Sequence, residues 1–436
     1  MKWLLTAVLL LVVAVAFNLS LLVYAIYAIA LIMLVSRLVT RNWAANVVSQ
    51  RKTSASTANV GDQVTVNIEI TNQAGWPITW MIIEDLIPPK SLSQHPPALK
   101  ISGKRIDICK FQGRETKRWI YQISCQRRGY HQIGPTLIET GDMFGFSRRF
   151  RVLNEPQFLL VYPEIIPLSG YDIDSKRPIG EVIMTNRLFE DPTRIAGVRD
   201  YQAGDAFNRI HWRATASTGK LQSKLYEPSS LAGATLLIDF HQDAYEPKHE
   251  PVRSELSIIA AASIASALHE MGQQCGLISN GRDAVDRIRQ EGWQGDERTR
   301  EQAAVAARMA SHSERIEPVI LPTRKGPVPH LQILGSLARL ELTDALSLPE
   351  LLLETQSRLS RSATVIAIVS NMNLEKAIAL QTLKKQGFRV MAIVNQFSDE
   401  NFAQTSSAFL DQGIPVSQLK DIDSIRGICE KTAMLK

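Results

Sequence analysis

Ala234-Thr235-Leu236-Leu237-Ile238-Asp239-Phe240 decides the fold of the C-terminal half of this 436-residue chain. The run is apolar until an acidic residue near its end, which is typical of a strand buried in a sheet. Four further apolar strands are predicted, at residues 274–279, 318–321, 363–370 and 387–394. Helical segments alternate with them, at residues 251–271, 299–310, 329–340, 349–360, 374–386, 401–411 and 421–431. This alternation predicts a parallel sheet with helices on both faces, a Rossmann-like α/β domain over residues 231–436.

Upstream of this domain, residues 54–165 have a different pattern. Val64, Val66, Ile68 and Ile70 alternate with polar residues, as on a half-buried strand. Further strands are predicted at residues 78–85, 117–124, 132–139 and 158–162. Short strands at this spacing indicate a small antiparallel β-sandwich with immunoglobulin-like dimensions.

The N-terminus is apolar. Residues 3–36 contain no charged side chain, and the stretch Asn18-Leu19-Ser20 interrupts the apolar run. One helix of about 20 residues spans a bilayer, so this block is too long for one simple span. We expect a transmembrane hairpin over residues 1–40, with the lipid bilayer as its partner. A single tilted anchor and a cleaved signal peptide are the alternatives.

Basic residues flank the apolar block. Lys2 precedes it, and Arg37, Arg41, Arg51 and Lys52 follow it. Positive charge marks the cytoplasmic side, so the folded part is expected in the cytoplasm, with these residues near anionic lipid. The net charge of +6 is small for this length, so we expect no nucleic-acid partner.

The four cysteines are Cys109, Cys125, Cys275 and Cys429. They form no CxxC pair and no Cys/His cluster with zinc spacing. Cys109 and Cys125 are candidates for neighbouring strands, but a cytoplasmic location disfavours a disulfide. We therefore expect reduced, mostly buried thiols.

Residues 166–230 contain a dense polar and aromatic block, GVRDYQAGDAFNRIHWRATA at positions 197–216. Gly204 permits a sharp turn, and Asp205 is predicted to cap a helix that begins at Ala206. Pairs of Asp200 or Asp205 with Arg199, Arg209 or Arg213 are expected to hold the segment in shape.

This block resembles the signature of the bacterial "domain of unknown function 58" family. The matching positions are Arg199, Tyr201, Gly204, Asp205, Arg209, Ile210, Trp212, Lys220, Leu221 and Glu227, and His211 lies among them. The stretches at 127–130, 134–135, 142–145 and 161–163 and the apolar N-terminus also resemble this family. Asn208 and Ser217 depart from the pattern, at positions where basic residues are common.

Three roles are open for the block: a structural lock, which we favour, a partner-binding surface, or a catalytic site. Asp205, His211 and Ser217 supply the residue types of a hydrolase triad. A Gly-x-Ser-x-Gly nucleophile elbow is absent from the sequence. The hydrolase is therefore retained only as an alternative, and we expect no catalytic residue.

The resemblance implies that the α/β domain is of von Willebrand factor A type. Such domains often hold Mg²⁺ at an Asp-x-Ser-x-Ser motif, whose hydroxyls are hard ligands. Here Asp239 is followed by His241 and Asp243 in place of both serines. We expect a degenerate, metal-free site at Asp239 and Asp243; a metal-dependent adhesion module is the alternative. The sequence contains no Walker, GxGxxG or HExxH motif, so no cofactor is expected.

The resemblance further implies a function. The family is linked to MoxR-type AAA+ ATPases, which suggests a non-enzymatic scaffold at the bacterial inner membrane. Such a scaffold would assemble or activate envelope-associated protein complexes. Nothing in composition or spacing identifies this partner.

Overall fold

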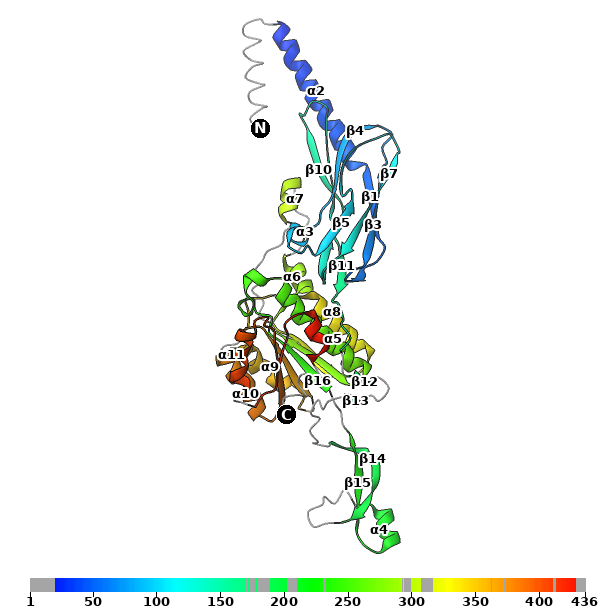
Figure 1. Cartoon of the computed structure of the whole chain (residues 1–436). Coiled ribbons are helices and arrows are strands. Elements are labelled where there is room, and N and C mark those ends of the chain that lie inside the picture. The colour runs from blue at the N-terminus through cyan, green and yellow to red at the C-terminus, as the bar shows by residue number, and fades with distance from the viewer. Residues whose placement is uncertain are drawn as a thin grey trace. The chain divides into compact units, whose positions relative to one another are not determined.

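The structure, a computed structural model, describes residues 20–168, 171–172, 177–178, 189–201, 210–229, 233–291, 293, 299–306, 317–361, 363–371, 374–410 and 413–428. The chain folds into two compact units. The first comprises residues 1–164, 283–313 and 338–340, and the second comprises residues 165–282, 314–337 and 341–436. The chain is therefore multidomain, with several β-sheets and helices (Figure 1).

The first unit holds the apolar helix and the antiparallel sheets. Its described elements are α2 (Ser20–Ala45), β1 (Val47–Thr53), β2 (Thr57–Asn59), β3 (Gln63–Asn72), β4 (Ile78–Asp85), α3 (Pro89–Ser93), β5 (Leu99–Gly103), β6 (Ile106–Phe111), β7 (Thr116–Cys125), β8 (Gly129–Ile133), β9 (Thr136–Gly141), β10 (Arg148–Asn154), β11 (Gln157–Tyr162), α6 (Ala284–Glu291) and α7 (Arg300–Ala306).

Helix α2 is long and apolar enough to cross a membrane: its segment Val23–Ala45 has a mean hydropathy of 2.0. A signal sequence can have the same length and hydropathy. Exposed leucine, isoleucine and tyrosine side chains cover it from Leu21 to Leu38. The helix begins at Ser20, at the predicted turn, and it continues to Ala45 without a break. The helix thus extends past residue 40, where the transmembrane segment was predicted to end. The first arm of the predicted hairpin lies outside the described residues.

Two four-stranded sheets share one apolar core. Their strand orders are β1-β3-β7-β5 and β10-β9-β4-β6, and a third sheet has the order β2-β11-β8. The alternation predicted from Val64 to Ile70 is confirmed, because the apolar residues of β3 are buried and join residues of β4 and β7 in one cluster. The sandwich begins with β1 at Val47, not at residue 54.

The predicted strand at residues 132–139 is wrong. Gly134 has a φ of +85°, and Pro135 has no N–H to donate to a ladder. The segment therefore divides into β8, which pairs with β11, and β9, which pairs with β4 and β10. The chain changes sheets at this point.

A buried polar network crosses the core of the first unit. Arg51 lies 3.6 Å from the Asp85 carboxylate, and both side chains are almost fully buried. The Tyr121 hydroxyl donates to the other Asp85 oxygen at 2.6 Å, and the Thr136 hydroxyl donates to the first at 2.8 Å. Arg51 also donates to the carbonyl of Ile133. The expectation that Arg51 lies near lipid is therefore wrong, because its charge is neutralised inside the protein.

Residues from the C-terminal half complete the first unit. Arg300 donates to Glu84 at 2.6 Å, and Ala303 packs with Leu86 and Leu137 in a small apolar cluster. The Arg128 guanidinium donates to the Leu340 carbonyl at 2.7 Å. The first unit is thus discontinuous in sequence.

The second unit holds the α/β domain. Its described elements are β12 (Tyr171–Asp172), β13 (Arg177–Pro178), β14 (Phe189–Asp200), α4 (Trp212–Thr218), β15 (Gln222–Ser229), β16 (Gly233–Ile238), η2 (Gln242–Ala244), η3 (Pro247–His249), α5 (Val252–Glu270), β17 (Gln274–Ser279), β19 (Val319–Arg324), α8 (Pro327–Arg339), α9 (Leu348–Thr355), η4 (Gln356–Arg358), β21 (Thr364–Val369), α10 (Leu374–Lys385), β22 (Arg389–Val394), α11 (Asp399–Leu410), β23 (Val416–Gln418) and α12 (Ile422–Arg426). The short strands β18 (Arg282–Asp283) and β20 (Leu340–Glu341) lie at the borders of the units in sequence.

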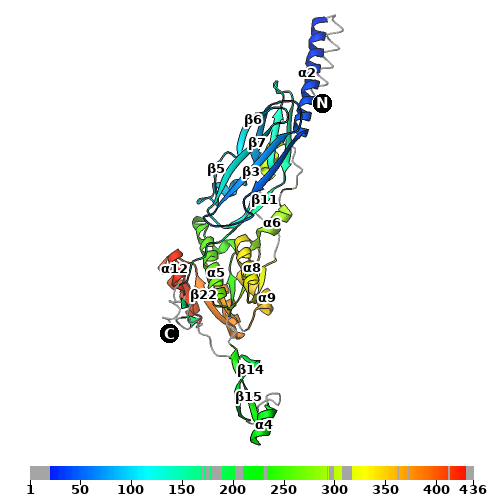
Figure 2. The ribbon, with the colours of Figure 1, turned by 90° about the vertical axis from the view of Figure 1, so that its right-hand side faces the viewer.

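The six-stranded sheet has the order β19-β17-β16-β21-β22-β23. With strands numbered along the chain this is 3-2-1-4-5-6, the order of a doubly wound sheet. Helix α5 packs against β16, β17 and β21, and α10 and α11 pack against β22. Figure 1 shows these helices around the sheet, and Figure 2 shows α5 and β22 from the side. Four of the five strand pairs are parallel, but β19 is antiparallel to β17. The prediction of a wholly parallel sheet is therefore wrong at this edge.

Three cysteines are described, and all are free: Cys109 is half-buried, and Cys125 and Cys275 are buried. Cys109 lies on β6 and Cys125 on β7, in different sheets. Burial raises the pKa of Cys109 and Cys125 to about 11 and that of Cys275 to about 12. Cys429 lies outside the described residues.

These pKa values predict slow alkylation. Because the thiolate is the reactive form, iodoacetamide at pH 8 should modify Cys275 in the folded protein at least about tenfold more slowly than in urea. Peptide mass spectrometry of native and denatured samples measures this ratio. Equal rates in both states would contradict the burial of Cys275.

Candidate functional site

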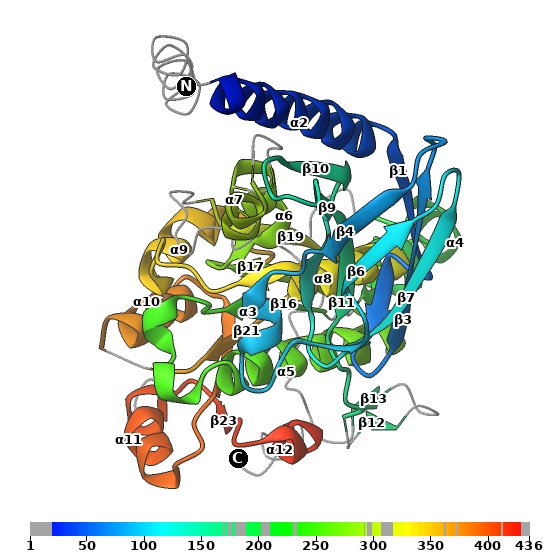
Figure 3. The same ribbon diagram turned by 90° about the horizontal axis from the view of Figure 1, so that it is seen from above.

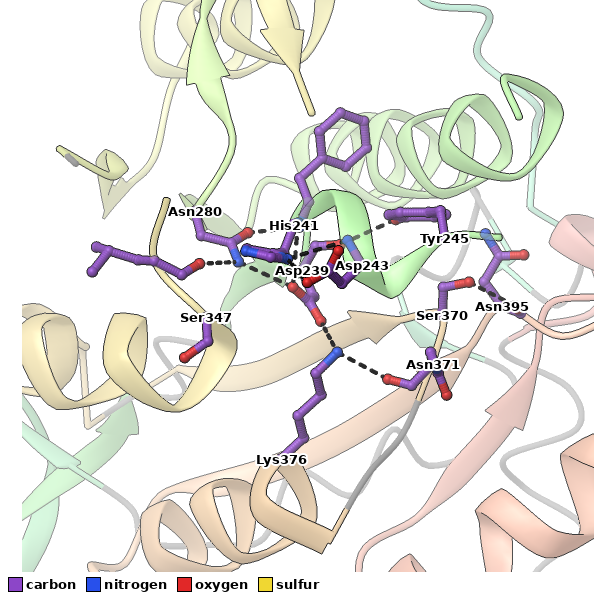
Figure 4. Close-up of polar contacts among 12 residues, drawn as sticks. Asp239, His241, Asp243, Tyr245, Asn280, Ser347, Ser370, Asn371, Lys376 and Asn395 are labelled. Atoms are coloured by element: carbon purple, nitrogen blue, oxygen red, sulfur yellow. Dashed lines mark hydrogen bonds and ion pairs between the residues drawn. The ribbon is translucent and has the colours of Figure 1, made fainter. Parts of the chain in front are cut away.

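The first candidate site is the edge of the sheet where β16, β17 and β21 end. Asp239 follows β16 and is fully buried. One oxygen of its carboxylate lies 2.7 Å from the Lys376 ammonium, and the other accepts a hydrogen bond from Asn280 at 3.0 Å. Lys376 also donates to the Asn371 carbonyl at 3.0 Å. Figure 4 shows the ammonium between these two acceptors.

Neighbouring polar side chains are directed to other partners. Asn280 also accepts from the Phe240 N–H at 2.6 Å and donates to the Leu346 carbonyl at 2.9 Å. The Tyr245 hydroxyl donates to the Asp239 carbonyl at 3.1 Å. These bonds satisfy the buried groups after the strand and hold its end rigid.

The side chains of His241 and Asp243 make no described contact with the Asp239 carboxylate, although the His241 N–H donates to it at 3.4 Å. The Asp243 side chain is 83% exposed, whereas that of Asp239 is buried. The His241 Nδ1 atom accepts from the Asp243 N–H at 3.2 Å, so it caps the short helix η2. Among the described residues, no group of three His, Cys, Asp or Glu side chains is placed to hold a metal. A divalent ion at Asp239 would have to displace the Lys376 ammonium, which already supplies positive charge.

Lys376 and Asn280 were missed in the sequence. Both lie just after the carboxyl ends of parallel strands, Asn280 after β17 and Lys376 in the first turn of α10, which follows β21. The carboxyl ends of neighbouring parallel strands meet at one edge. Their positions after predicted strands are the signal in the sequence that points to this edge.

The second candidate site is the hairpin formed by β14, α4 and β15, which contains the family signature; we call it the signature hairpin. In the ladder Arg199 pairs with Ser223 and Asp200 with Gln222. Tyr201 donates its N–H to the Leu221 carbonyl at 2.9 Å. Ile210 forms a bridge with Ser223, and both are buried. The described signature residues thus pair with one another through backbone hydrogen bonds.

Helix α4 begins at Trp212, with His211 as its N-cap. The His211 Nδ1 atom accepts from the Ala214 N–H at 3.1 Å, and Gly219 ends the helix with a φ of +68°. The predicted helix from Ala206 lies outside the described residues, as do Gly204, Asp205 and Arg209. The backbone of Glu227 lies in β15.

Among the described contacts Asp200 has a neutral partner, and Arg209, one of its predicted partners, lies outside the described residues. The Asp200 carboxylate accepts from the Gln222 amide at 2.6 Å, and Arg199 donates to the Asp200 carbonyl at 3.1 Å. The described contacts of this segment thus include backbone pairing and a side-chain amide.

The described geometry does not suit a catalytic triad at His211. In a triad the histidine Nδ1 carries a proton toward a carboxylate, but here Nδ1 accepts from Ala214. The Ser217 hydroxyl donates to the Ala214 carbonyl at 2.9 Å and is exposed.

The signature hairpin exposes three large apolar side chains. No residue of α4 is buried, and Trp212 is 68% exposed. Leu221 and Val198 are also exposed. Because these side chains stay exposed, they do not stabilise the hairpin by burial. They are therefore candidates for contact with a partner.

Comparison with known proteins agrees with the resemblance of the signature. Residues 197–312 match the family described as "Protein of unknown function DUF58". The match covers most of the signature hairpin and the first part of the α/β domain.

A similar protein is the "Uncharacterized protein YeaD" of Bacillus subtilis (strain 168), which is 26% identical over 239 residues. The match covers 54% of this chain and 56% of that protein, so the chain spans little more than half of its relative's length.

Solved structures give only distant likenesses. Proximal thread matrix protein 1 from the mussel byssus is 12% identical, with a TM-score of 0.29 over 47% of this chain and 45% of that one. The CARDB domain of the PF1109 protein from Pyrococcus furiosus is 11% identical, with a TM-score of 0.18 over 26% of this chain and 91% of that one.

Proposed function

We propose that this protein is a membrane-anchored, non-enzymatic scaffold that binds a protein partner through the signature hairpin. The observation that carries the proposal is the exposure of Trp212 on a helix without a buried residue. Tryptophan is enriched among the residues that dominate binding energy at protein interfaces. The hydrogen bonds of His211 and Gly219 fix the helix before a partner arrives, which lowers the entropy cost of binding.

In this proposal α2 is the membrane anchor. Its apolar side chains are exposed from Leu21 to Leu38, as expected for a helix surrounded by lipid. Arg37 and Arg41 at its end favour a cytoplasmic location for the units that follow. The membrane is then the bacterial inner membrane.

The α/β domain is proposed to be a metal-independent variant of the von Willebrand factor A type. The supporting observations are the strand order of the six-stranded sheet with its antiparallel edge strand, and Asp239 at the end of the central strand β16. Lys376 provides the positive charge that a metal ion would supply. Adhesion through a shared metal ion is then not its mode of binding.

The partner is proposed to be an AAA+ ATPase of the MoxR type, and this class comes from the family resemblance alone. The scaffold would position such an ATPase at the membrane, where it assembles or activates envelope-associated complexes.

The test is a pair of tryptophan substitutions in the full chain. Trp212→Ala should weaken capture of the ATPase from native membranes by about thirtyfold, because a central interface residue contributes at least about 2 kcal/mol. Trp76 is the matched control, since it is 70% exposed but lies between β3 and β4. Affinity purification followed by quantitative mass spectrometry measures the captured ATPase.

Trp76→Ala should leave capture unchanged. An equal loss with both variants, or no AAA+ ATPase with the wild type, would overturn the proposed partner surface.

A further inference from the structure

The β9–β10 hairpin of the first unit ends in an exposed apolar loop. Met143, Phe144 and Phe146 are all exposed, and the rings of the two phenylalanines lie 6.1 Å apart. Three large apolar side chains within four residues are unusual on a surface that only meets water.

The loop is held open by Asp142. Its carboxylate accepts hydrogen bonds from the backbone N–H groups of Phe144, Phe146 and Ser147, at 3.0, 3.2 and 2.5 Å. Partial burial of the carboxyl works against its ionisation, yet these three donors lower the pKa of Asp142. Gly145 between the two rings has a φ of +77° and open space around it. The loop therefore displays its apolar tip in a prearranged form.

The contacts of β10 with α2 give the direction of the loop. Arg151 donates to the Ala44 and Ala45 carbonyls, both at 2.8 Å, while the Ser147 hydroxyl lies 2.9 Å from that of Thr40. The chain from Arg151 back to Ser147 therefore runs along α2 from its C-terminal end toward its exposed apolar segment. Residues 143–146 precede Ser147 and therefore lie beyond Thr40, on the side of the exposed apolar segment of α2. Figures 1 and 3 show β10 beside α2.

A basic pocket lies at the same end of the helix. Its volume is ≈ 590 Å³, and it is lined by Arg41, Ala44, Ala45, Arg149, Phe150 and Arg151. None of these described lining residues is acidic, and the Nε atom of Arg149 is buried with no hydrogen-bond partner. The pocket is thus complementary to an anion.

The position of the pocket agrees with the headgroup layer of a bilayer. The exposed apolar side chains of α2 end at Leu38. At about 1.5 Å per residue, Arg41 and Ala44 lie about 4–9 Å beyond that point. Headgroups extend about 5–8 Å beyond each side of the hydrocarbon core.

We propose that the first unit makes a second contact with the membrane: the β9–β10 loop inserts Met143, Phe144 and Phe146 into the lipid interface, and Arg41 and Arg149 bind the phosphate of an anionic lipid headgroup. The inference rests on the proposal that α2 crosses the membrane. The anchor and the loop then approach the bilayer at two separate points, which restricts rotation of the first unit about α2.

The first experiment measures the depth of the loop. The full chain carrying Phe144→Trp is reconstituted into vesicles of phosphatidylcholine and phosphatidylglycerol whose acyl chains are brominated. Bromine quenches the added tryptophan only within the bilayer. Ile108→Trp is the matched control, because Ile108 and Phe144 are each 69% exposed and Ile108 lies on β6.

The added fluorescence at position 144 should be quenched at least about twofold more than that at position 108. Equal quenching, in protein that floats with the vesicles, overturns the loop contact while leaving the anchor intact. Failure to float overturns the anchor and the loop together.

The second experiment measures headgroup binding. Each arginine near an anionic surface strengthens attachment by about fivefold. The double variant Arg41→Gln/Arg149→Gln should therefore bind phosphatidylglycerol about twenty-fivefold more weakly in native mass spectrometry of detergent-purified protein. Arg118→Gln is the control, because Arg118 is an exposed arginine of the same unit paired with Glu69.

If the double variant binds phosphatidylglycerol as strongly as the wild type, the headgroup site is overturned. Displacement of phosphatidylglycerol by an excess of inorganic phosphate alone would identify a phosphate site and also overturn the commitment to lipid.

Discussion

Lys376→Met is expected to lower the free energy of unfolding of the α/β domain by about 3–5 kcal/mol. The Asp239 carboxylate is fully buried, and Lys376, at 2.7 Å, is the cation that balances its charge. Methionine fills a similar volume but leaves that charge uncompensated. The Asn280 amide and the His241 N–H remain as donors, but neutral donors do not replace an ammonium.

Hydrogen exchange of the β16 amides in a urea series measures the lost stability of this domain. A local probe is needed because a chain with two units has no single free energy of unfolding. Lys420→Met is the control, since Lys420 forms an exposed pair with Asp399 at 3.1 Å and should contribute less than about 1 kcal/mol. The double variant Asp239→Asn/Lys376→Met should recover most of the stability, because it removes both charges.

A small effect of Lys376→Met, similar to that of Lys420→Met, would show that water or another cation reaches Asp239. Stabilisation of the wild type by Mg²⁺ would contradict the idea that the ammonium takes the place of a metal ion.

Arg51→Met should destabilise the first unit by a similar amount, about 3–5 kcal/mol. It removes the buried cation beside Asp85 and the donor to the Ile133 carbonyl, the last residue of β8. Tyr121 and Thr136 still donate to Asp85. Because the carboxylate keeps two neutral donors without its cation, it remains an uncompensated charge in an apolar core.

Hydrogen exchange in β3 and β7 measures this loss. Arg118→Met is the matched control, because the pair of Arg118 with Glu69 is exposed and links the same two strands. Tyr121→Phe removes only a hydrogen bond and should cost about 1–3 kcal/mol. Full stability of Arg51→Met would contradict the buried network.

Elements with a clear hydrophobic pattern were predictable from the sequence. The alternation in β3 and the apolar run of β16 depend on local residue types, and both strands lie where the pattern indicated. The predicted strand across Gly134 failed because the apolar pattern continues through a backbone break. The direction of β19 depends on how the chain returns to the sheet edge, which residue patterning does not encode.

Long-range charge pairing was the part that could not be predicted. In the sequence Arg51 belongs to a group of basic residues that follow the apolar segment. Only the folded structure places it beside Asp85. Lys376 lies 137 positions from its carboxylate partner. A charged residue carries no local sign of whether it will be buried and paired, so sequence periodicity misses it.

The discontinuity of the first unit has a consequence for biogenesis. As the nascent chain leaves the ribosome, Glu84 emerges 216 residues before Arg300, its partner in the finished unit. Leu86 likewise emerges long before Ala303, with which it packs. The sandwich therefore stays incomplete while the first part of the α/β domain is translated. Fragments that stop before residue 283 will leave the apolar patch at Leu86 and Leu137 uncovered and are poor choices for expression.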